Sequence, residues 1–282
     1  MILNLQYINP DILPTVFKKR NSSANKGCFG TICILGGGIG MVGAPLLAGR
    51  AALKTGAGKV LIGFAQKKTP LNCDILYPEL MLSNAMYWLK SNISINVWVA
   101  GCGLGQSNLS KILLNYLIKY QNTPLVLDAD GLNLLAKRRI SINTQNNLRP
   151  IVLTPHPVEA SRLLNLTVKQ IQSDREGSAL ALSKLYKSWI VLKGKDTIIC
   201  QPDGLIMKNT TGNVGLATSG TGDVLSGIIG SLIAQNISLE EAVPGAVWLH
   251  GAAADLLVSQ GIGPIGLTAG ELSEAVRKLR NQ

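Results

Sequence analysis

Short, continuously apolar runs alternate with amphipathic segments along most of this chain of 282 residues. A run without polar interruptions is typical of a strand that is buried on both faces of a sheet. We expect such strands at 31–35, 59–63, 96–100, 124–128, 150–154 and 190–193. Segments with helical spacing stand between them, among them 44–55, 108–120 and 157–164. This alternation predicts the α/β class, with a single doubly wound, mostly parallel sheet that is flanked by helices.

Polar or glycine-rich turns directly follow four of the predicted strands. They occupy residues 36–43, 101–107, 128–133 and 154–159. In an open α/β sheet, ligands bind in the crevice outside the carboxyl ends of the strands. We therefore expect these four turns to line one ligand-binding crevice.

The chain has no Pro- or Ser-rich linker and no internal repeat at which it would divide. We expect one domain over 27–282. A mixed polar lead-in segment over 1–26 should pack on that domain or on a partner subunit. Near the C-terminus, Ser238 and Glu241 have the spacing of a capping box at the start of a helix.

The formal net charge is +11, and the basic residues gather in short clusters such as those at 18–20 and 277–280. No aromatic residues are interleaved with them, as a surface for single-stranded nucleic acid would require. Solvated helix ends explain these clusters better, so we expect no nucleic-acid partner. The excess positive charge should still steer anionic small molecules toward the protein.

The cysteine and histidine content argues against a disulfide framework and a metal centre. The five cysteines show no C-x-x-C spacing, and the chain has two histidines. The N-terminus lacks a signal-peptide pattern, and no apolar run reads as long enough to cross a bilayer. We therefore expect a cytoplasmic protein without a membrane-spanning segment.

Segment 209–227 is rich in glycine and hydroxyl residues and contains one carboxylate, Asp223. An apolar pattern at helical spacing follows, which predicts one apolar helix face beginning near Gly222. Free N–H groups at such a helix start attract phosphate. An acid at this place is suited to take a proton from a hydroxyl beside the phosphate, so we predict phosphoryl-transfer chemistry with Asp223 as the base. The alternative is a glycine-rich turn in which Asp223 only caps the helix.

Gly38 to Gly43 match G-x-G-x-x-G between a strand and a helix. This spacing is found in dinucleotide-binding folds, but the acid expected about 20 residues further on is missing. A loop whose backbone approaches some other ligand explains the glycines better.

Two prolines stiffen the turn 154–159 and direct His156 and Glu159 toward the crevice. His156 is a candidate for a hydrogen bond to a ligand, and Glu159 for a hold on hydrated magnesium or phosphate. The alternative makes His156 a helix cap and Glu159 a partner of the helix dipole.

Three further groups of polar residues leave both a binding and a structural interpretation open. The turn 193–197 offers two lysines and a glycine to a nucleotide, or it is an ordinary charged hairpin. Asp128, Asp130 and Asn133 end a strand and suit a sugar or a metal ion, with helix capping by Asp130 as the alternative. His250 lies in a segment of small residues, and we expect it to be structural.

Taken together, these segments resemble the ADP/ATP-dependent NAD(P)H-hydrate dehydratases, repair enzymes with a ribokinase-like fold. The resemblance extends from about Gly27 to Lys278. The segments that carry it are 43–58, 127–133, 154–159, 193–197 and 211–223. Cys102 stands where the family usually has proline, and Ser219 where it usually has glycine, which bears on loop geometry rather than on chemistry.

The resemblance implies a reaction in which the S epimer of hydrated NADH or NADPH (NADHX or NADPHX) is dehydrated. Its C6 hydroxyl attacks the terminal phosphate of ADP or ATP, and phosphate then leaves to restore the cofactor. Asp223 would be the catalytic base. N–H groups around Gly220, Thr221 and Gly222 would stabilise the phosphoryl group that moves.

The resemblance also implies binding residues and partners. The residues implied to bind the nucleotide are Lys193, Gly194, Lys195, Asp196, Thr197, Gly220, Thr221 and Gly222. Those implied to contact the hydrate are Ala44, Gly105, His156 and Asp223. Glu159 is the candidate ligand for Mg²⁺. The family further suggests a homotetramer, and an epimerase for the hydrate would be a separate protein.

Two other function classes remain as alternatives. A ribokinase-like kinase acting on a vitamin-precursor alcohol would share the anion-binding loop and Asp223. A nucleotide-sensing or nucleic-acid-binding module would need no base at Asp223 and would bind DNA or RNA with a steep salt dependence.

Overall fold

The computed structural model describes the chain except for residues 1–4, 138–140 and 143–148. Its strands are β1 (Leu5–Tyr7), β2 (Thr31–Gly36), β3 (Lys59–Phe64), β4 (Met81–Asn84), β5 (Val97–Ala100), β6 (Leu125–Leu127), β7 (Ile151–Leu153), β8 (Trp189–Leu192), β9 (Ile198–Cys200) and β10 (Ile206–Lys208). Its α-helices are α1 (Gly43–Thr55), α2 (Ala85–Lys90), α3 (Asn108–Tyr120), α4 (Ala129–Ala136), α5 (Pro157–Leu164), α6 (Val168–Ser173), α7 (Arg175–Tyr186), α8 (Thr221–Ala234), α9 (Leu239–Ser259) and α10 (Ala269–Arg280).

The strands form one sheet in the order β1-β10-β9-β8-β7-β6-β5-β2-β3-β4. Neighbouring strands run parallel except in the pairs β8–β9 and β9–β10. The prediction of a single, mostly parallel sheet flanked by helices is confirmed. All six expected strands are present, whereas β1 and β4 at the two edges were not expected. Edge strands are short and half exposed, so they lack the continuous apolar run that marks a central strand.

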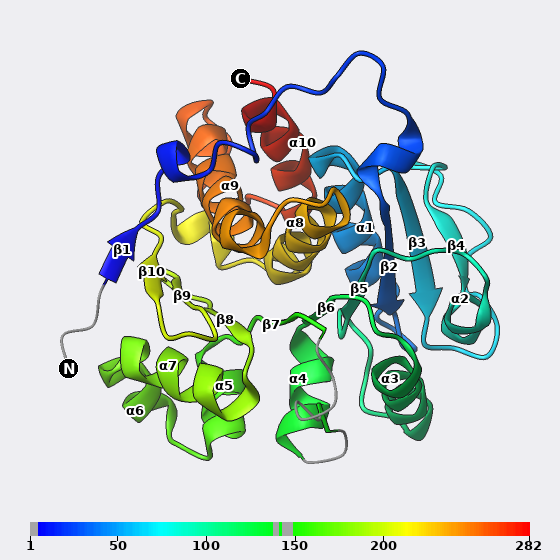
Figure 1. Cartoon of the computed structure of the whole chain (residues 1–282), viewed down its shortest axis with the longest axis horizontal. Coiled ribbons are helices and arrows are strands. Elements are labelled where there is room, and N and C mark those ends of the chain that lie inside the picture. Colours follow the sequence, from blue (N-terminus) through cyan, green and yellow to red (C-terminus); the bar gives the residue numbers. More distant parts are fainter. Residues whose placement is uncertain (1–4, 138–140, 143–148) are drawn as a thin grey trace.

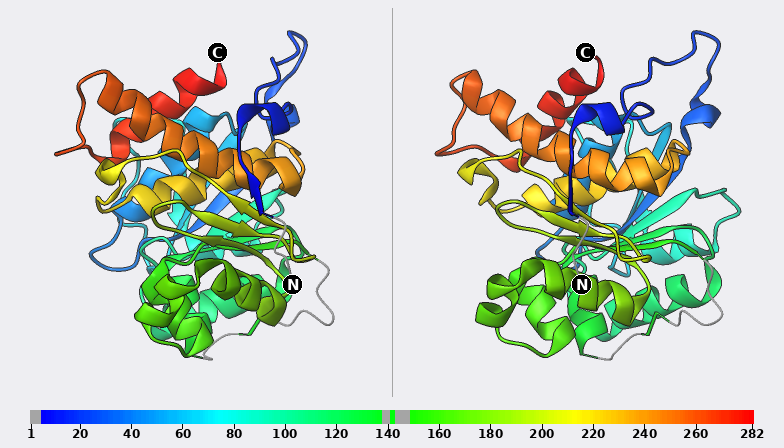
Figure 2. Two further views of the ribbon diagram at one scale, coloured as in Figure 1. Left: turned by 90° about the vertical axis from the view of Figure 1, so that its left-hand side faces the viewer. Right: turned by 60° about the vertical axis from the view of Figure 1, so that its left-hand side comes forward.

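Helices cover both faces of the sheet (Figure 1, Figure 2). One face is covered by α1, α8, α9 and α10, and the other by α2 to α7. Successive side chains of β2 show the two cores: Ile32 and Ile34 enter one, Cys33 and Leu35 the other. Full burial of an aliphatic side chain of this size stabilises a fold by roughly 1.5–3 kcal/mol, so both faces of the sheet contribute to stability.

Helix α8 is buried on nearly every side, not on the single face that its sequence pattern predicts. It lies against the sheet, α1 and α9 at once, which explains why small residues fill the positions between its aliphatic ones. A Cβ at Gly227 would lie 2.1 Å from the backbone oxygen of Ala48 on α1. The close approach of the two helices therefore depends on glycine at this position.

The lead-in segment packs on the domain and contributes a strand to its sheet. β1 pairs in parallel with β10, and Leu13 and Val16 are fully buried in the core. The carboxylate of Glu241 accepts hydrogen bonds from the backbone N–H and the hydroxyl of Thr15, both at 2.7 Å. Ser238 makes no side-chain cap. The predicted capping box is therefore wrong, because Glu241 holds the lead-in segment instead.

Helix α9 corrects the expectation that no apolar run is long enough to cross a bilayer. Among the described residues it is the one helix that meets the length and composition of a membrane span. However, 72% of that stretch is buried inside the protein. Such burial is typical of the core helix of a layered domain, where it serves the contacts with α8 and α10.

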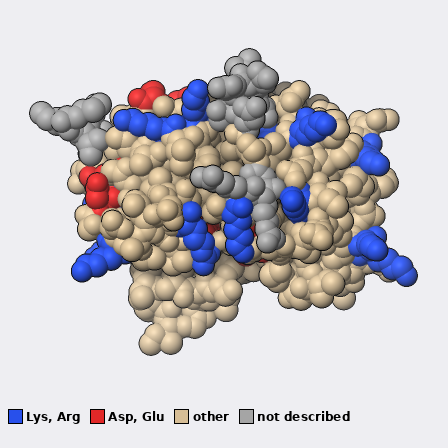
Figure 3. All heavy atoms as spheres, turned by 90° about the horizontal axis from the view of Figure 1, so that it is seen from below, with Lys and Arg blue, Asp and Glu red and all other residues tan. Residues whose placement is uncertain are grey.

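The basic clusters are partly structural rather than simply solvated. Arg20 donates to the carbonyl of Gly56 and stacks over the ring of Phe29 at 3.5 Å. Arg280 donates to the carbonyl of Val16 at 3.0 Å. On the face formed by α3 to α7, Lys and Arg stand in separate groups rather than in one patch (Figure 3).

Candidate active site

The loops that follow β2 and β5 form the floor of the predicted crevice. The N–H groups of Gly37 and Gly38 donate to the carbonyls of Cys102 and Gly103, at 3.1 and 2.7 Å. β2 is also the strand at which the chain reverses its direction across the sheet, because β3 lies on one side of it and β5 on the other. Such a switch point is where α/β sheets bind ligands. The loops after β2 and β5 are therefore in contact as expected, while the ligand-binding crevice itself stays a prediction.

The substrate residues expected at this crevice lie near one another at the strand ends. A Cβ at Gly103 would lie 2.9 Å from the Cβ of Ala44, and one at Gly105 would lie 3.4 Å from Cε of Met41. The N–H of Gly105 donates to Oδ2 of Asp130 at 2.8 Å. The loop that contains Gly105 therefore lies against the start of α1, where Ala44 is found. Contact of either residue with a substrate stays a prediction.

A cavity of about 630 Å³ opens beside this crevice. Its lining includes the whole turn 193–197 together with Thr221 and Gly222, as expected for the nucleotide site, whereas Gly220 does not line it. The wall that the sequence did not predict comes from α9. It consists of Val247, His250 and Gly251.

Two side chains from α9 hold the glycine-rich loop around this cavity. Asp255 accepts hydrogen bonds from the N–H of Gly212 and the amide of Asn213, at 2.7 and 2.9 Å. Nε2 of His250 lies 2.9 Å from the carbonyl oxygen of Thr221. Burial lowers the pKa of His250 to about 4, although the bond to Thr221 opposes that shift. His250 is therefore neutral at physiological pH, and its expected structural role extends to the start of α8.

The start of α8 has unpaired N–H groups at the edge of the cavity. Gly220 is the N-cap residue, with a φ of 91° that favours glycine, and no side chain caps the helix. In the described part of the chain, the N–H groups of Gly222 and Asp223 have no backbone or side-chain acceptor. Free donors at a helix N-terminus bind anions. The alternative in which Asp223 caps the helix is wrong.

Asp223 does not line the cavity but lies next to Gly222, which does. Its carboxylate accepts a hydrogen bond from the thiol of Cys102 in the loop after β5. Burial raises the pKa of Asp223 to about 6, and the neighbouring Asp128 adds to the rise. Asp223 thus stands between the nucleotide cavity and the strand-end crevice, with a pKa suited to a base near neutral pH.

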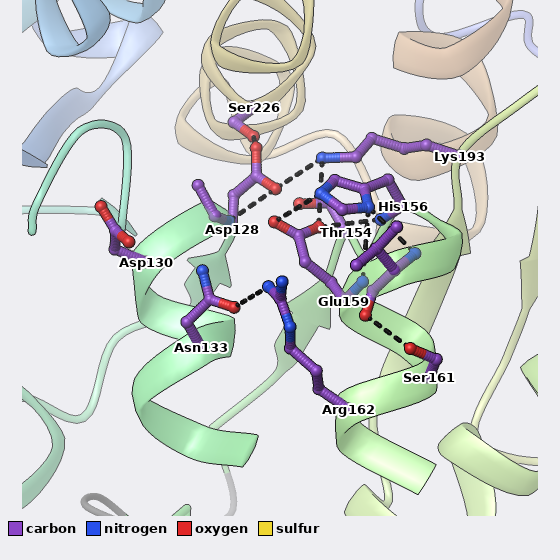
Figure 4. A network of polar contacts seen from close by, with 12 residues as sticks. Asp128, Asp130, Asn133, Thr154, His156, Glu159, Ser161, Arg162, Lys193 and Ser226 are labelled. Atoms are coloured by element: carbon purple, nitrogen blue, oxygen red, sulfur yellow. Dashed lines mark hydrogen bonds and ion pairs between the residues drawn. The ribbon is translucent and has the colours of Figure 1, made fainter. Parts of the chain in front are cut away.

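Asp128 is the centre of a buried polar network (Figure 4). Its Oδ1 lies 2.6 Å from Nζ of Lys193, and its Oδ2 accepts the hydroxyl hydrogen of Ser226 at 2.8 Å. Asp128 also accepts from the N–H of Ala129, so Asp128 rather than Asp130 caps α4. Burial alone would lower the pKa of Lys193, but Asp128 and Glu159 outweigh it and the pKa is raised. Lys193 therefore stays cationic beside the site.

His156 and Glu159 form the capping box of α5. Nδ1 of His156 accepts the N–H groups of Val158 and Glu159, and Oε2 of Glu159 accepts the N–H of His156 at 2.8 Å. Burial raises the pKa of Glu159 to about 7, against the opposing effect of Lys193, which lies 3.9 Å away. The structure therefore shows the alternative in which His156 caps the helix and Glu159 lies in its first turn. A contact of His156 with substrate stays a prediction.

Glu159 is a poor match to its predicted role as a magnesium ligand. One of its oxygens serves the capping box and the other lies 3.3 Å from Nε2 of His156, with a lysine nearby. No group of three or more His, Cys, Asp or Glu in the described residues is arranged to hold a metal ion. Mg²⁺ prefers free carboxylates and water, often with substrate phosphates, so Glu159 with its described neighbours does not fit a magnesium site.

Asn133 points away from the predicted sugar or metal site. Its Oδ1 accepts from the guanidinium of Arg162 at 2.7 Å, which links α4 to α5 (Figure 4). The three polar residues of this strand end therefore have separate tasks: Asp128 faces Lys193, Asp130 holds Gly105, and Asn133 joins two helices.

Comparison with known proteins gives concordant matches. The sequence profile of a family described as NAD(P)H-hydrate dehydratase matches residues 32–278. The ADP-dependent (S)-NAD(P)H-hydrate dehydratase of Neisseria meningitidis serogroup B is 44% identical over 270 residues, covering 95% of this chain and 91% of that protein. The bifunctional NAD(P)H-hydrate repair enzyme of Coxiella burnetii is 40% identical over 266 residues, covering 93% of this chain but 53% of its own length.

A solved structure agrees with the sequence matches. The ADP/ATP-dependent NAD(P)H-hydrate dehydratase of Bacillus subtilis, co-crystallised with ATP and Mg²⁺, superposes with a TM-score of 0.86. The two chains share 30% of their residues, and the match covers 98% of each. The likeness therefore extends over nearly the whole fold.

Proposed function

The chain belongs to the NAD(P)H-hydrate dehydratase family, and from the geometry of its site we propose that Asp223 is the base of the family's reaction. The protein is an enzyme that dehydrates the S epimer of NADHX and NADPHX with ADP or ATP as co-substrate. The observation that supports Asp223 is its place beside the free N–H groups of α8, between cavity and crevice. The matches to the family model and to the relatives favour dehydration over the activity of a vitamin-alcohol kinase and over binding of nucleic acid.

The chemistry requires a base and an anion site next to each other. The C6 hydroxyl attacks the terminal phosphorus of the nucleotide as its proton passes to Asp223. The bond from that phosphorus to the bridging oxygen breaks, and AMP leaves when the nucleotide is ADP. The lone pair of the ring nitrogen then expels phosphate from C6, and loss of a proton from C5 restores the double bond.

The residues of this chain divide that work by position. The turn 193–197 and the loop 209–214 enclose the nucleotide. The free N–H groups of Gly222 and Asp223 receive the charge of the phosphoryl group. Lys193 adds a cation behind them, since a Cβ at Gly222 would lie 3.4 Å from its Nζ. We assign the hydrate to the strand-end side, near Ala44, Gly105 and His156.

The proposed function also includes a metal ion, an epimerase partner, an assembly state and a location in the cell. Magnesium would be held by the phosphates of the nucleotide rather than by Glu159, because the carboxylates near the site are engaged by protein donors. A separate epimerase would supply the S epimer, which fits the existence of bifunctional repair enzymes among the relatives. Assembly as a homotetramer can be checked by light scattering, and a cytoplasmic location by cell fractionation.

The function is tested by incubating the purified protein with NADHX and ADP. We expect absorbance in the reduced-nicotinamide band to recover, with AMP and phosphate released in equal amounts. Recovery that fails while a thiazole or pyrimidine alcohol is phosphorylated would overturn the assignment in favour of the kinase. The same assay with ATP and with NADPHX measures the nucleotide and cofactor preferences.

The raised pKa of Asp223 predicts an acid limb in the rate. Asp223 accepts a proton only when it is ionised, so kcat/KM for NADHX should rise with pH up to about 6 and level off above it. Below that pH the rate should fall close to tenfold per pH unit, as for a single titrating group. A rate that is constant between pH 5 and 7.5 would contradict the assignment of Asp223 as base.

The thiol of Cys102 offers a way to assign this limb to Asp223. Its hydrogen bond lowers the pKa of Asp223, so Cys102→Ala should raise that pKa and move the limb to higher pH. We expect about a twofold loss of rate at pH 6 and little loss at pH 8, as for a shift of about half a unit. Cys200→Ala, which removes a buried thiol on β9, is the matched control. Because both variants use the same substrates, titration of ADP itself cancels. An unmoved limb in Cys102→Ala would refute this assignment.

A further inference from the structure

Arg175 stands behind the turn that lines the nucleotide cavity. It is the first residue of α7, and its guanidinium donates to three backbone carbonyls, one at the end of β8 and two in the turn that follows. Nη1 donates to the carbonyl of Lys195, and Nη2 donates to those of Leu192 and Lys193 at 3.0 and 3.4 Å. One side chain from a different element therefore fixes two carbonyls of the turn 193–197 and the strand end before it.

The turn 193–197 separates the nucleotide cavity from a second hollow on the protein surface. Lys195 and Asp196 line both the nucleotide cavity and a second, outer hollow of about 440 Å³. Arg175 lines the outer hollow and does not reach the nucleotide cavity. Any effect of Arg175 on the nucleotide must therefore act through the backbone of the turn.

The orientation of the peptide planes shows how Arg175 can act on the nucleotide through the backbone. In a trans peptide, a carbonyl and the N–H of the next residue point opposite ways. Because the carbonyls of Lys193 and Lys195 turn toward Arg175, the N–H groups of Gly194 and Asp196 turn the other way. Gly194 and Asp196 both line the nucleotide cavity, and within the described chain no hydrogen bond uses either N–H. Two backbone donors thus face the cavity.

Local stability does not explain an arginine at this position. A cation at the first residue of a helix is opposed by the helix dipole. The Nε of Arg175 is buried without an acceptor among the described residues, and burial lowers the pKa of the guanidinium. The contacts of Arg175 with the turn offset these unfavourable features. The planar guanidinium of arginine can donate hydrogen bonds to several carbonyls at once.

We propose that Arg175 is a positioning residue for the nucleotide: it orients the turn 193–197 so that the N–H groups of Gly194 and Asp196 bind ADP or ATP. This proposal rests on the nucleotide site of the proposed function. It assigns to Arg175 a role in nucleotide affinity and none in the chemistry at Asp223.

The test compares Arg175→Gln and Arg175→Lys with Lys184→Ala, which removes an exposed cation from the same helix. Calorimetric titration with ADP, without NADHX, measures binding independently of turnover. We expect the Kd and KM for ADP to rise about tenfold in Arg175→Gln and about threefold in Arg175→Lys, as for loss of charge-assisted hydrogen bonds. The kcat and the KM for NADHX should stay within about twofold, and Lys184→Ala should bind ADP like the wild type.

Several outcomes overturn the proposal. Unchanged ADP affinity in Arg175→Gln would overturn it. An equal rise in the KM for ADP and the KM for NADHX would also overturn it, because a merely structural role predicts that both rise together. If Arg175→Gln fails to fold by circular dichroism, the folded Arg175→Lys decides the question by the same split. A wild-type protein that neither binds ADP nor restores NADH would instead refute the proposed function itself.

Discussion

Asp223→Asn is expected to abolish most turnover while leaving nucleotide binding intact. The amide keeps the shape of the carboxylate beside Gly222 but cannot accept the hydroxyl proton. We expect kcat to fall roughly 10²–10⁴-fold, the usual contribution of a general base. The Kd for ADP should stay within about threefold, because the donors of the cavity come from the backbone and not from this side chain. Steady-state kinetics and calorimetry measure the two quantities.

The stability of the same variant separates a catalytic from a structural role. Folding raises the pKa of Asp223 above its ordinary value, so above pH 6 the fold bears a penalty for the ionised group. A neutral amide removes that penalty, and Tm at pH 7.5 should therefore be equal or higher. Asp203→Asn, at an exposed turn, is the matched control and should keep full turnover. A lower Tm with parallel losses of binding and turnover would show that Asp223 is structural.

Lys193→Met is expected to destabilise the fold as well as weaken nucleotide binding. The sequence suggests only a cation for the nucleotide, but Lys193 is also the partner of Asp128, whose side chain is 2% exposed. Removing one member of a buried pair leaves the other charge uncompensated, which typically lowers the free energy of unfolding by about 3–5 kcal/mol. Urea unfolding at pH 7.5 measures this loss.

A double-mutant cycle shows whether the loss comes from Asp128. In Lys193→Met with Asp128→Asn, no unpaired charge is left, so we expect a substantial part of the lost stability to return. Lys195→Met, which removes the neighbouring exposed lysine of the same turn, should change the free energy of unfolding by less than about 0.5 kcal/mol. Additive losses in the double variant would show that Lys193 and Asp128 do not interact energetically.

The elements that the sequence predicted well are those with strong local patterns. The central strands β2, β3 and β5 are apolar apart from the first residues of β2 and β3, which are Thr31 and Lys59. Helices α1 and α5 are found within a residue of their expected bounds. The edge strands β1 and β4 were missed, because a few half-exposed residues carry no pattern of their own. Helix α8 was found, but its burial on all sides was not, since that depends on what packs around it.

Within the site, sequence reasoning found the groups that act through local chain geometry. The turn 193–197 and the start of α8 line the cavity because glycines and a helix terminus expose N–H groups wherever they occur. It missed Asp255 and Ser226, whose partners are remote, and it expected a structural His250 without placing it in the wall of the cavity. A signal for Ser226 existed, because a hydroxyl residue follows Asp223 by three positions in a mainly apolar helix.

The amino-acid sequence by itself determined the succession of the central strands and the helices along the chain, the anion-binding start of α8 and the family. Each of these follows from residues that are neighbours in the chain. Tertiary structure alone decided which charges meet. Lys193 and Ser226 lie 65 and 98 residues from Asp128, yet both bond to its carboxylate. The pKa of Asp223 and the use of His156 and Glu159 as a helix cap were decided in the same way. Such contacts depend on the order of the strands within the sheet and on burial. Neither can be inferred from residues that are neighbours in the chain.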